Sequence, residues 1–233
     1  MTPATDLRDA AAALGVPLTP VSESRLERLL ARVREEGATQ NLTAILEPGD
    51  MVVDHLLDSL ALAGVATGLG VPIGEGTRGV DIGSGGGFPG IPLAAAIPGS
   101  RWTLVESEGR KAEWLRRIVS ELGLTHAEVF QGRARELRHN RADLEGACDL
   151  VTARAVGELG KIAREARGLL RPGGLLLCPK GPALADAERA LGAREAGKSR
   201  LEPAGEIPMK VPGRDRVCVA YRAATPRAAA GPR

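Results

Sequence analysis

The sequence predicts an α/β fold, in which a mostly parallel sheet is covered by helices on both faces. Strand-like apolar runs alternate with helical runs from residue 79 to about residue 195, which is typical of parallel sheets. The residues before this region show helical periodicity, and two extended runs near the end of the chain predict a hairpin. We therefore expect a helical appendage at 1–68, an α/β domain at 69–223 and a disordered tail at 224–233.

The appendage is predicted to contain two helices. Apolar residues of the first follow the i, i+3, i+4, i+7 spacing of one helix face: Leu26, Leu29, Leu30 and Val33. Ser22 or Ser24 is expected to cap its beginning, and Gly37 is expected to end it. The second helix runs through "EPGDMVVDHLLDSLALAG" and is expected to end at Gly64.

The alternating region is predicted to contain five strands. In chain order these runs are "GVDI", "WTLVE", "AEVFQG", "CDLVTARA" and "GLLLCPKG". Helical runs between and after them include "GIPLAAAIP", "RKAEWLRRIVSELG", "ELGKIAREARGLL" and "ALADAERALGARE". The stretch "EPAGEIPMKVPGRDRVCVAYRA" contains two further extended runs joined by "PGRD", which predicts an antiparallel hairpin at the end of the sheet.

The composition narrows the classes of protein. The net charge is only +2, so a nucleic-acid partner would have to bind a local basic patch. The three cysteines lie in apolar strand-like runs, which indicates buried thiols in a reducing cytosol. Neither an apolar leader nor a run of 18 apolar residues occurs, so we expect a cytoplasmic protein without a membrane span. The three histidines are scattered, which argues against a metal site.

A glycine-rich loop follows the first predicted strand, in "GVDIGSGGGFPGIPLA". Glycines at this density let a ligand approach the backbone, with N–H groups and a helix N-terminus facing it. Two patterns fit the loop. Asp81 begins D-x-G-x-G-x-G, whereas Gly85, Gly87 and Gly90 satisfy the G-x-G-x-x-G fingerprint of dinucleotide-binding proteins. The spacing alone therefore leaves a nicotinamide dinucleotide and a methyl donor both open.

Two acidic residues at strand ends favour the methyl donor. Asp81 precedes the turn, and Glu106 ends the next strand, where a carboxylate can accept hydrogen bonds from ribose hydroxyls. S-adenosylmethionine carries such a ribose and a sulfonium cation but no phosphate, so carboxylates suit it. The alternating units and the terminal hairpin also match the mostly parallel, seven-stranded, Rossmann-like sheet of class I methyltransferases. The structural alternative is a plain tight turn beside two solvated acids.

Several short motifs then occur together in a specific order. They are "NLTAI" (41–45), "HLLDSL" (55–60), "DIGSGGGFPGIPLA" (81–94), "GRARE" (132–136), "ARAV" (153–156) and "PKG" (179–181). With these motifs the sequence resembles, from about Leu26 to Tyr221, the bacterial 16S ribosomal RNA guanine-N7 methyltransferases, also called glucose-inhibited division protein B. The resemblance implies methyl transfer from S-adenosylmethionine to guanine N7 in the decoding-region loop of 16S rRNA. The implied partner is 16S rRNA or the small ribosomal subunit, and we expect a monomer.

The resemblance also implies site residues, carried over by position. The implied cofactor contacts are Gly83, Phe88, Glu106, Ala134, Arg135 and Arg154. Glu106 has the ribose position, and Arg154 lies near the methyl donor. The backbone of Ala134 and Arg135 follows a predicted strand, where it could bind the adenine edge.

Guanine N7 carries an in-plane lone pair and no proton, so the reaction needs positioning rather than a general base. The residues expected to act near the methyl group are Arg154, Asn41 and Lys180. The two cations could bind guanine O6 or a phosphate, and the amide of Asn41 could read a base edge. The structural alternative for Arg154 is a salt bridge to Glu106 or Asp81, because an unpaired buried charge is costly.

Other polar residues allow two interpretations. His55 and Asp58 lie three residues apart on one helix face, where they either shape the lip of the pocket or form a buried contact between appendage and sheet. Basic clusters that could touch RNA occur in "QGRARELRHNRAD", in "EWLRRIV" and among Arg25, Arg28, Arg32 and Arg34. The competing functions are a small-molecule methyltransferase, a nicotinamide-dependent oxidoreductase, and an RNA-binding or chromosome-linked factor with a relic cofactor site.

Overall fold

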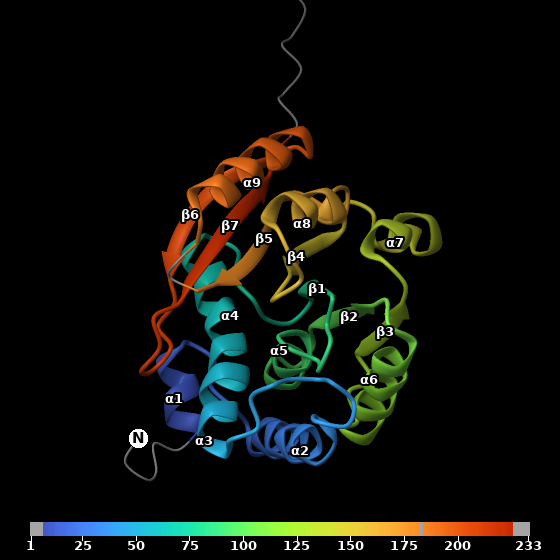
Figure 1. Cartoon of the computed structure of the whole chain (residues 1–233), viewed down its shortest axis with the longest axis vertical. Helices are drawn as coiled ribbons and strands as arrows, with labels where there is room; N and C mark the ends of the chain where they lie inside the picture. Colours follow the sequence, from blue (N-terminus) through green and yellow to red (C-terminus); the bar gives the residue numbers. More distant parts are fainter. Residues whose placement is uncertain (1–6, 182–183, 226–233) are drawn as a thin grey trace, which may run out of the picture.

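The computed structural model describes residues 7–181 and 184–225 and contains one seven-stranded sheet (Figure 1). Its strands are β1 (Arg78–Ile82), β2 (Arg101–Glu106), β3 (Ala127–Gln131), β4 (Cys148–Thr152), β5 (Leu170–Lys180), β6 (Leu201–Pro208) and β7 (Val217–Ala223). The order across the sheet is β3-β2-β1-β4-β5-β7-β6. The first five strands are parallel, and β7 pairs antiparallel with both β5 and β6. The predicted fold class and the terminal hairpin are therefore confirmed.

Helices cover both faces of the sheet, and each face has its own apolar core (Figure 1). One face carries α1 (Leu7–Ala13), α2 (Pro20–Glu36), α4 (Asp58–Gly68), α5 (Gly90–Ala96) and α6 (Gly109–Glu121). The other carries α7 (Ala134–Asn140), α8 (Leu159–Ala166) and α9 (Asp186–Lys198). A short 3₁₀ helix, η2 (Ala142–Leu144), follows α7. Along β5, Leu175 and Leu177 enter the first core, while Leu176 and Cys178 enter the second. This period-2 alternation between two buried faces is why the strand reads as a continuous apolar run.

The second predicted helix is longer than expected. It consists of α3 (Pro48–Met51), a π-helical turn η1 (Val52–Leu57) and α4, and it passes Gly64 without ending. A Cβ atom on Gly64 would lie 2.9 Å from the carbonyl oxygen of Leu14, so this glycine permits close packing against the segment after α1. The prediction that Gly64 ends the helix is wrong.

Thr19, rather than Ser22 or Ser24, caps α2 by accepting a hydrogen bond from the Ser22 N–H.

Three arginines of α2 stabilise the C-terminal end of α6. Arg25 donates to the carbonyls of Leu122 and Gly123 at 2.9 and 3.0 Å, and Arg28 donates to that of Glu121 at 2.6 Å. Arg32 forms an ion pair with the Glu121 carboxylate at 2.9 Å. Cations at this end of α6 donate to carbonyls that have no partner within the helix, and they interact favourably with the negative end of the helix dipole. These charges therefore join the appendage to the sheet layer.

Two features of the core bear on the expected class of protein. The stretch Pro48–Gly68 is long and apolar enough to cross a membrane, but 78% of its apolar window is buried inside the fold, as in a core helix. Cys148, Cys178 and Cys218 are unpaired and buried in β4, β5 and β7, which confirms the prediction of buried thiols. Burial raises the pKa of Cys148 and of Cys178 to about 12.

Candidate functional site

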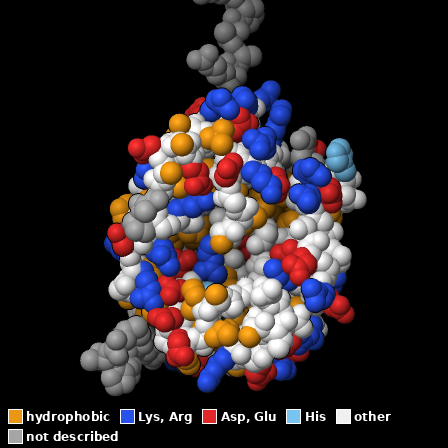
Figure 2. All heavy atoms as spheres, viewed as in Figure 1, with side chains coloured by type: hydrophobic (Ala, Val, Ile, Leu, Met, Phe, Trp, Pro, Cys, Tyr) orange, Lys and Arg blue, Asp and Glu red, His pale blue; other side chains and the backbone are white. Residues whose placement is uncertain are grey.

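A cavity of about 690 Å³ lies at the carboxyl edge of the parallel strands. Its walls come from the loop between α2 and α3, the turn η1, the glycine loop, and the segments that follow β2, β4 and β5. Arg216, from the segment that joins β6 to β7, completes the lining. Figure 2 shows a hollow near the centre of this face, where basic, acidic and apolar side chains come together. The position agrees with the rule that α/β sheets bind ligands beyond the carboxyl ends of their strands.

The glycine loop forms the floor of the cavity. Gly83, Gly85 and Gly87 all have positive φ angles, of 69°, 52° and 89°. A Cβ on Gly83 would lie 2.5 Å from Val156, whereas one on Gly85 would meet no neighbouring atom closer than 3.8 Å. The loop thus needs glycine at the first position for packing. At Gly85 it leaves the main chain bare beside open space.

Glu106 holds the glycine loop in this shape. Its Oε2 accepts a hydrogen bond from the Gly85 N–H at 2.9 Å, and its Oε1 accepts one from the Glu108 N–H at 2.8 Å. The residue is 8% exposed and lines the cavity at the end of β2. Because each carboxylate oxygen has a second lone pair, Glu106 can still accept hydrogen bonds from a ligand.

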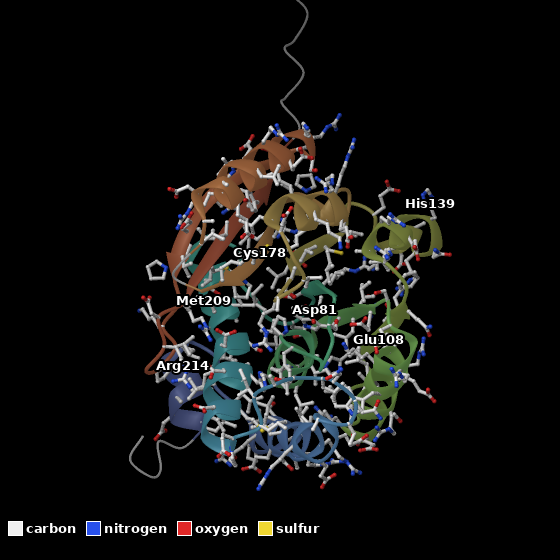
Figure 3. All side chains as sticks on the ribbon, in the orientation of Figure 1. Asp81, Glu108, His139, Cys178, Met209 and Arg214 are labelled. Carbon is white, nitrogen blue, oxygen red and sulfur yellow. The ribbon has the colours of Figure 1, made fainter. Side chains whose placement is uncertain are left out.

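Asp81 does not face the cavity, contrary to the expectation that it would meet the ligand. It is fully buried near the middle of the molecule (Figure 3). Its carboxylate accepts hydrogen bonds from the Gly90 N–H at 3.1 Å and from the Thr152 hydroxyl at 2.9 Å. Burial raises the pKa of Asp81 to about 6. Asp81 therefore ties the tip of β1 to the start of α5 and to β4, beneath the glycine loop.

Arg154 lies just beyond β4, so the expectation that it belongs to the strand is wrong. Its salt bridge is formed with Asp58 at 3.2 Å, not with Glu106 or Asp81. Its guanidinium lies 5.3 Å from the ring centre of Phe88, and its side chain is 18% exposed. The cation therefore borders the cavity while its charge is paired with the appendage.

The π-helical turn supplies a second acceptor for Arg154. The N–H of Asp58 donates to the carbonyl of Val53, five residues back, whereas in an α-helix it would donate to that of Asp54. The Asp54 carbonyl accepts from Arg154 Nη1 at 2.6 Å instead. The irregular turn thus provides a backbone acceptor that a regular helix would have used itself.

His55 lies between Arg154 and the glycine loop. It is 3% exposed and stacks on Phe88, with ring centres 4.5 Å apart and ring planes at 17°. Its Nδ1 is 3.4 Å from Arg154 Nη2, and its Nε2 is 3.0 Å from the hydroxyl oxygen of Thr43. Burial, and next the charge of Arg154, lower the pKa of His55 to about 4, so the imidazole is neutral at physiological pH.

Burial raises the pKa of Asp58, while Arg154 and Arg216 oppose that shift. Its Oδ1 is 3.5 Å from Arg216 Nε. His55 and Asp58 are therefore both buried contacts between the appendage and the sheet and part of the cavity wall, so the two interpretations of this pair coincide.

The remaining predicted residues lie at different distances from the cavity. Lys180 lines it, with Nζ 2.9 Å from both the Gly157 carbonyl and the Glu188 carboxylate. Ala134 and Arg135 begin α7 directly beyond β3 and are outside the lining. Asn41 is exposed, with a φ of 54°, and does not line the cavity, whereas Leu42, Thr43 and Ile45 of the same loop do.

Sequence reasoning missed several contributors to this site, among them Thr43 and Arg216. Thr43 lies inside the "NLTAI" motif, so the motif itself was the available signal. Arg216 lies in the hairpin segment and gave no signal, because only the fold brings it to η1. Within residues 7–181 and 184–225, no group of three or more His, Cys, Asp or Glu side chains could hold a metal ion.

The chain has the fold of Rossmann-like methyltransferases. It is similar to a SAM-dependent methyltransferase from Aquifex aeolicus, with a TM-score of 0.55 and 17% identity over 76% of this chain and 94% of that one. It is also similar to Aeropyrum pernix fibrillarin, whose crystal structure holds natively bound S-adenosyl-L-methionine, with a TM-score of 0.52 and 21% identity over 64% and 68% of the two chains.

Sequence comparison narrows the class to one family. The family model described as rRNA small subunit methyltransferase G matches residues 22–202. The chain is 40% identical to the Sorangium cellulosum protein of that name, over 90% of this chain and 87% of that one. It is 38% identical to the Chloroflexus aggregans protein of the same name, over 94% and 90%. This chain belongs to the rRNA small subunit methyltransferase G family, which confirms the resemblance found in its motifs.

Replacing Asp81 by Asn should flatten the dependence of stability on pH. The folded-state pKa of about 6 exceeds the ordinary value of 3.8, so the folded protein binds more protons between these values. The contribution of Asp81 is fully present below pH 3.8 and is lost as pH rises through 6. It amounts to roughly 2–3 kcal/mol. Urea denaturation from pH 4 to 7 measures it, with Glu47→Gln, an exposed acid, as the control. Equal pH slopes in wild type and Asp81→Asn would contradict the assignment.

Proposed function

We propose that this protein transfers a methyl group from S-adenosylmethionine to N7 of a guanine in the decoding-region loop of 16S rRNA. The carrying observation is the cavity at the tips of β1 and β2, with bare main chain at Gly85, the carboxylate of Glu106 beside it and the guanidinium of Arg154 at its edge. Family membership supports both the cofactor and the rRNA substrate.

The residues present fit the cofactor. Gly83 lines the cavity, Gly85 leaves open space beside its main chain for the methionine end, and Glu106 keeps lone pairs for the ribose hydroxyls. The backbone of Ala134 and Arg135 lies beyond β3, whose Gln131 pairs with Glu106, so it suits the adenine end. Phe88 is packed on His55 and beside Arg154, which makes it a wall of the site. When bound, S-adenosylmethionine supplies an electrophilic methyl group on its sulfonium.

The chain's part in catalysis is to position the base. N7 needs no general base, because its lone pair is free. Arg154 is held at three points by Asp54, Asp58 and His55, and its remaining N–H groups can donate to the cofactor or to RNA. Lys180, which is fixed by Glu188, supports RNA binding from the end of β5. Asn41, exposed at the start of its loop, contacts RNA at the rim.

RNA phosphates are proposed to bind near the start of α6 and α7. Arg110 and Arg135 are exposed there, and neither side chain has a hydrogen bond or ion pair with the residues that the structure describes. Arg25, Arg28 and Arg32 are instead engaged with the end of α6. Free cations can release counterions on binding RNA, whereas cations already paired within the protein gain less.

The remaining expectations stay proposals. A monomer suffices for the reaction, because one chain supplies every described wall of the cavity. A cytoplasmic location follows from the rRNA substrate. In the proposed division of the chain, 1–68 provides the cavity wall at η1, and 69–223 provides the part of the wall at the ends of the strands. Most of the tail expected at 224–233 lies outside the described residues.

Gly85→Ala should weaken cofactor binding far more than it weakens the fold. The alanine would keep an unfavourable positive φ, and its methyl group would project into the cavity. We expect affinity for S-adenosylhomocysteine to fall about tenfold or more, by calorimetry. Gly70→Ala is the matched control, because Gly70 has a φ of 78° and open space but lies outside the cavity. Equal affinities in both variants would argue against this position for the cofactor.

Methyl transfer itself tests the proposed function. Labelled S-adenosylmethionine is incubated with the protein and with small subunits that lack the modification, and the labelled base is mapped. We expect one N7-methylguanine in the decoding-region loop of 16S rRNA. Label in a small molecule would point to the small-molecule methyltransferase. A melting-temperature rise with NADH but not with S-adenosylhomocysteine would point to the oxidoreductase. Cofactor binding without transfer to any ribosomal fraction would favour the RNA-binding factor.

Arg110→Ala should affect RNA binding, whereas Arg25→Ala should affect stability. Arg110→Ala should raise KM for small subunits and reduce the slope of log KM against log salt by about one, without lowering stability. Arg25→Ala should lower the free energy of unfolding by about 1–2 kcal/mol, because two hydrogen bonds to carbonyls are lost, and should leave the salt slope unchanged. A normal salt slope for Arg110→Ala would move the RNA contact elsewhere.

A further inference from the structure

With the His55 tautomer assigned below, the hydroxyl of Thr43 has no acceptor for its proton among the described residues, and this points to a contact with the substrate. The inference rests on the proposed function and deepens it, because it concerns how the site distinguishes guanine from adenine. Thr43 is half-buried in the loop between α2 and α3 and lines the cavity. That loop passes over the glycine loop, where a Cβ on Gly86 would lie 3.2 Å from the Leu42 carbonyl (Figure 1).

Arg154 fixes the protonation of His55. A guanidinium has only donors, so we assign the unprotonated nitrogen of His55 to Nδ1, which faces Arg154 Nη2 at 3.4 Å. The neutral ring then carries its proton on Nε2, the nitrogen that faces Thr43. This tautomer is assigned from the hydrogen-bond network.

The Thr43 oxygen therefore acts as an acceptor toward the protein. It accepts from His55 Nε2–H at 3.0 Å and from the Ile45 N–H at 3.0 Å. A hydroxyl has two acceptor lone pairs and one donor, so both lone pairs are used and only the proton is left. Across residues 7–181 and 184–225, no hydrogen bond donated by this hydroxyl to another acceptor is found. The proton is available to whatever enters the cavity.

We propose that Thr43 is a specificity-determining residue that donates a hydrogen bond to O6 of the target guanine. O6 lies beside N7 on the same edge of guanine, so a donor there aligns the base and leaves the N7 lone pair free. Adenine presents an N6 amino group, a donor, at the same place. Because the Thr43 oxygen has no free lone pair, it cannot accept from that amino group. The hydrogen-bond network that begins at Arg154 thus leaves the Thr43 hydroxyl able only to donate. Guanine O6 can accept this hydrogen bond, whereas the N6 amino group of adenine cannot.

The acceptor could instead be a phosphate oxygen of the RNA backbone. Such a contact would position the RNA without reading the base. The experiment below separates the two, because only a contact with O6 depends on which base stands at the methylated position.

The test compares Thr43→Val and Thr43→Ser on small subunits, and on subunits reconstituted with 2-aminopurine at the methylated position. 2-Aminopurine keeps N7 and lacks O6. With guanine, we expect Thr43→Val to lower kcat/KM about 5- to 30-fold, and Thr43→Ser to stay within about twofold of wild type. When 2-aminopurine replaces guanine, kcat/KM of the wild type should fall by a similar factor. The same replacement should lower kcat/KM of Thr43→Val only slightly. Affinity for S-adenosylhomocysteine checks that the Thr43→Val site is intact.

Each result decides one statement. If wild type methylates no guanine, the proposed function fails. If wild type is active and Thr43→Val is equally fast, or loses the same factor with both bases, the contact with O6 is overturned. Nitrogen-15 NMR of His55 gives a readout that does not depend on activity, with the neutral Nε2–H tautomer expected near pH 7. The Nδ1–H tautomer or an imidazolium there would overturn the assignment for Thr43.

Discussion

The position of one guanidinium determines the shape of the site. Arg154 leaves the sheet at the end of β4 and enters the appendage, where a carboxylate, a backbone carbonyl and an imidazole nitrogen each accept one of its N–H groups. A cation that is mostly buried is tolerated only when it is matched in this way. The π-helical turn supplies the carbonyl, and the burial of His55 keeps its ring neutral so that it can accept. Cation, turn and histidine are therefore one unit.

The same turn is held from outside by the hairpin segment. Arg214 and Arg216 both pair with the Asp54 carboxylate, at 2.7 and 3.2 Å, and Arg214 lies beside the appendage in Figure 3. These cations keep the pKa of Asp54 below its ordinary value, chiefly through the hydrogen bond from Arg214. The cavity is thus assembled from the beginning, middle and end of the chain.

The sequence predicts the sheet well because each strand and helix is indicated by the residues of its own segment. Alternating strand-like and helical runs indicate a parallel sheet, and β-strands buried on both faces read as continuous apolar runs. The errors concern residues whose role is set by distant contacts. Gly64 resembles a helix stop, yet it serves close packing on Leu14. Asp81 stands at a strand end, but Thr152, on another strand, and Gly90 take up its lone pairs.

The site is predicted only in part, because local patterns indicate some of its residues and distant contacts determine the others. The glycine loop and Glu106 follow from the order of strand, turn and acid, and the structure places them together. The partner of Arg154 did not follow, because a π-helical turn leaves no mark in the hydrophobic pattern of "HLLDSL" and its effect appears only when β4 ends beside it. Sequence patterns thus indicate which residues are polar and where strands end, but not which lone pairs remain free.

The three buried thiols have a practical consequence. Cys148, Cys178 and Cys218 lie on β4, β5 and β7, which are neighbours in the middle of the sheet. An alkylating reagent needs the thiolate and needs access, and the folded sheet withholds both. Modification must therefore wait until these strands separate. The rate of alkylation therefore measures how often the sheet opens. A cysteine introduced on the surface would be the one thiol that a dye labels in the native protein.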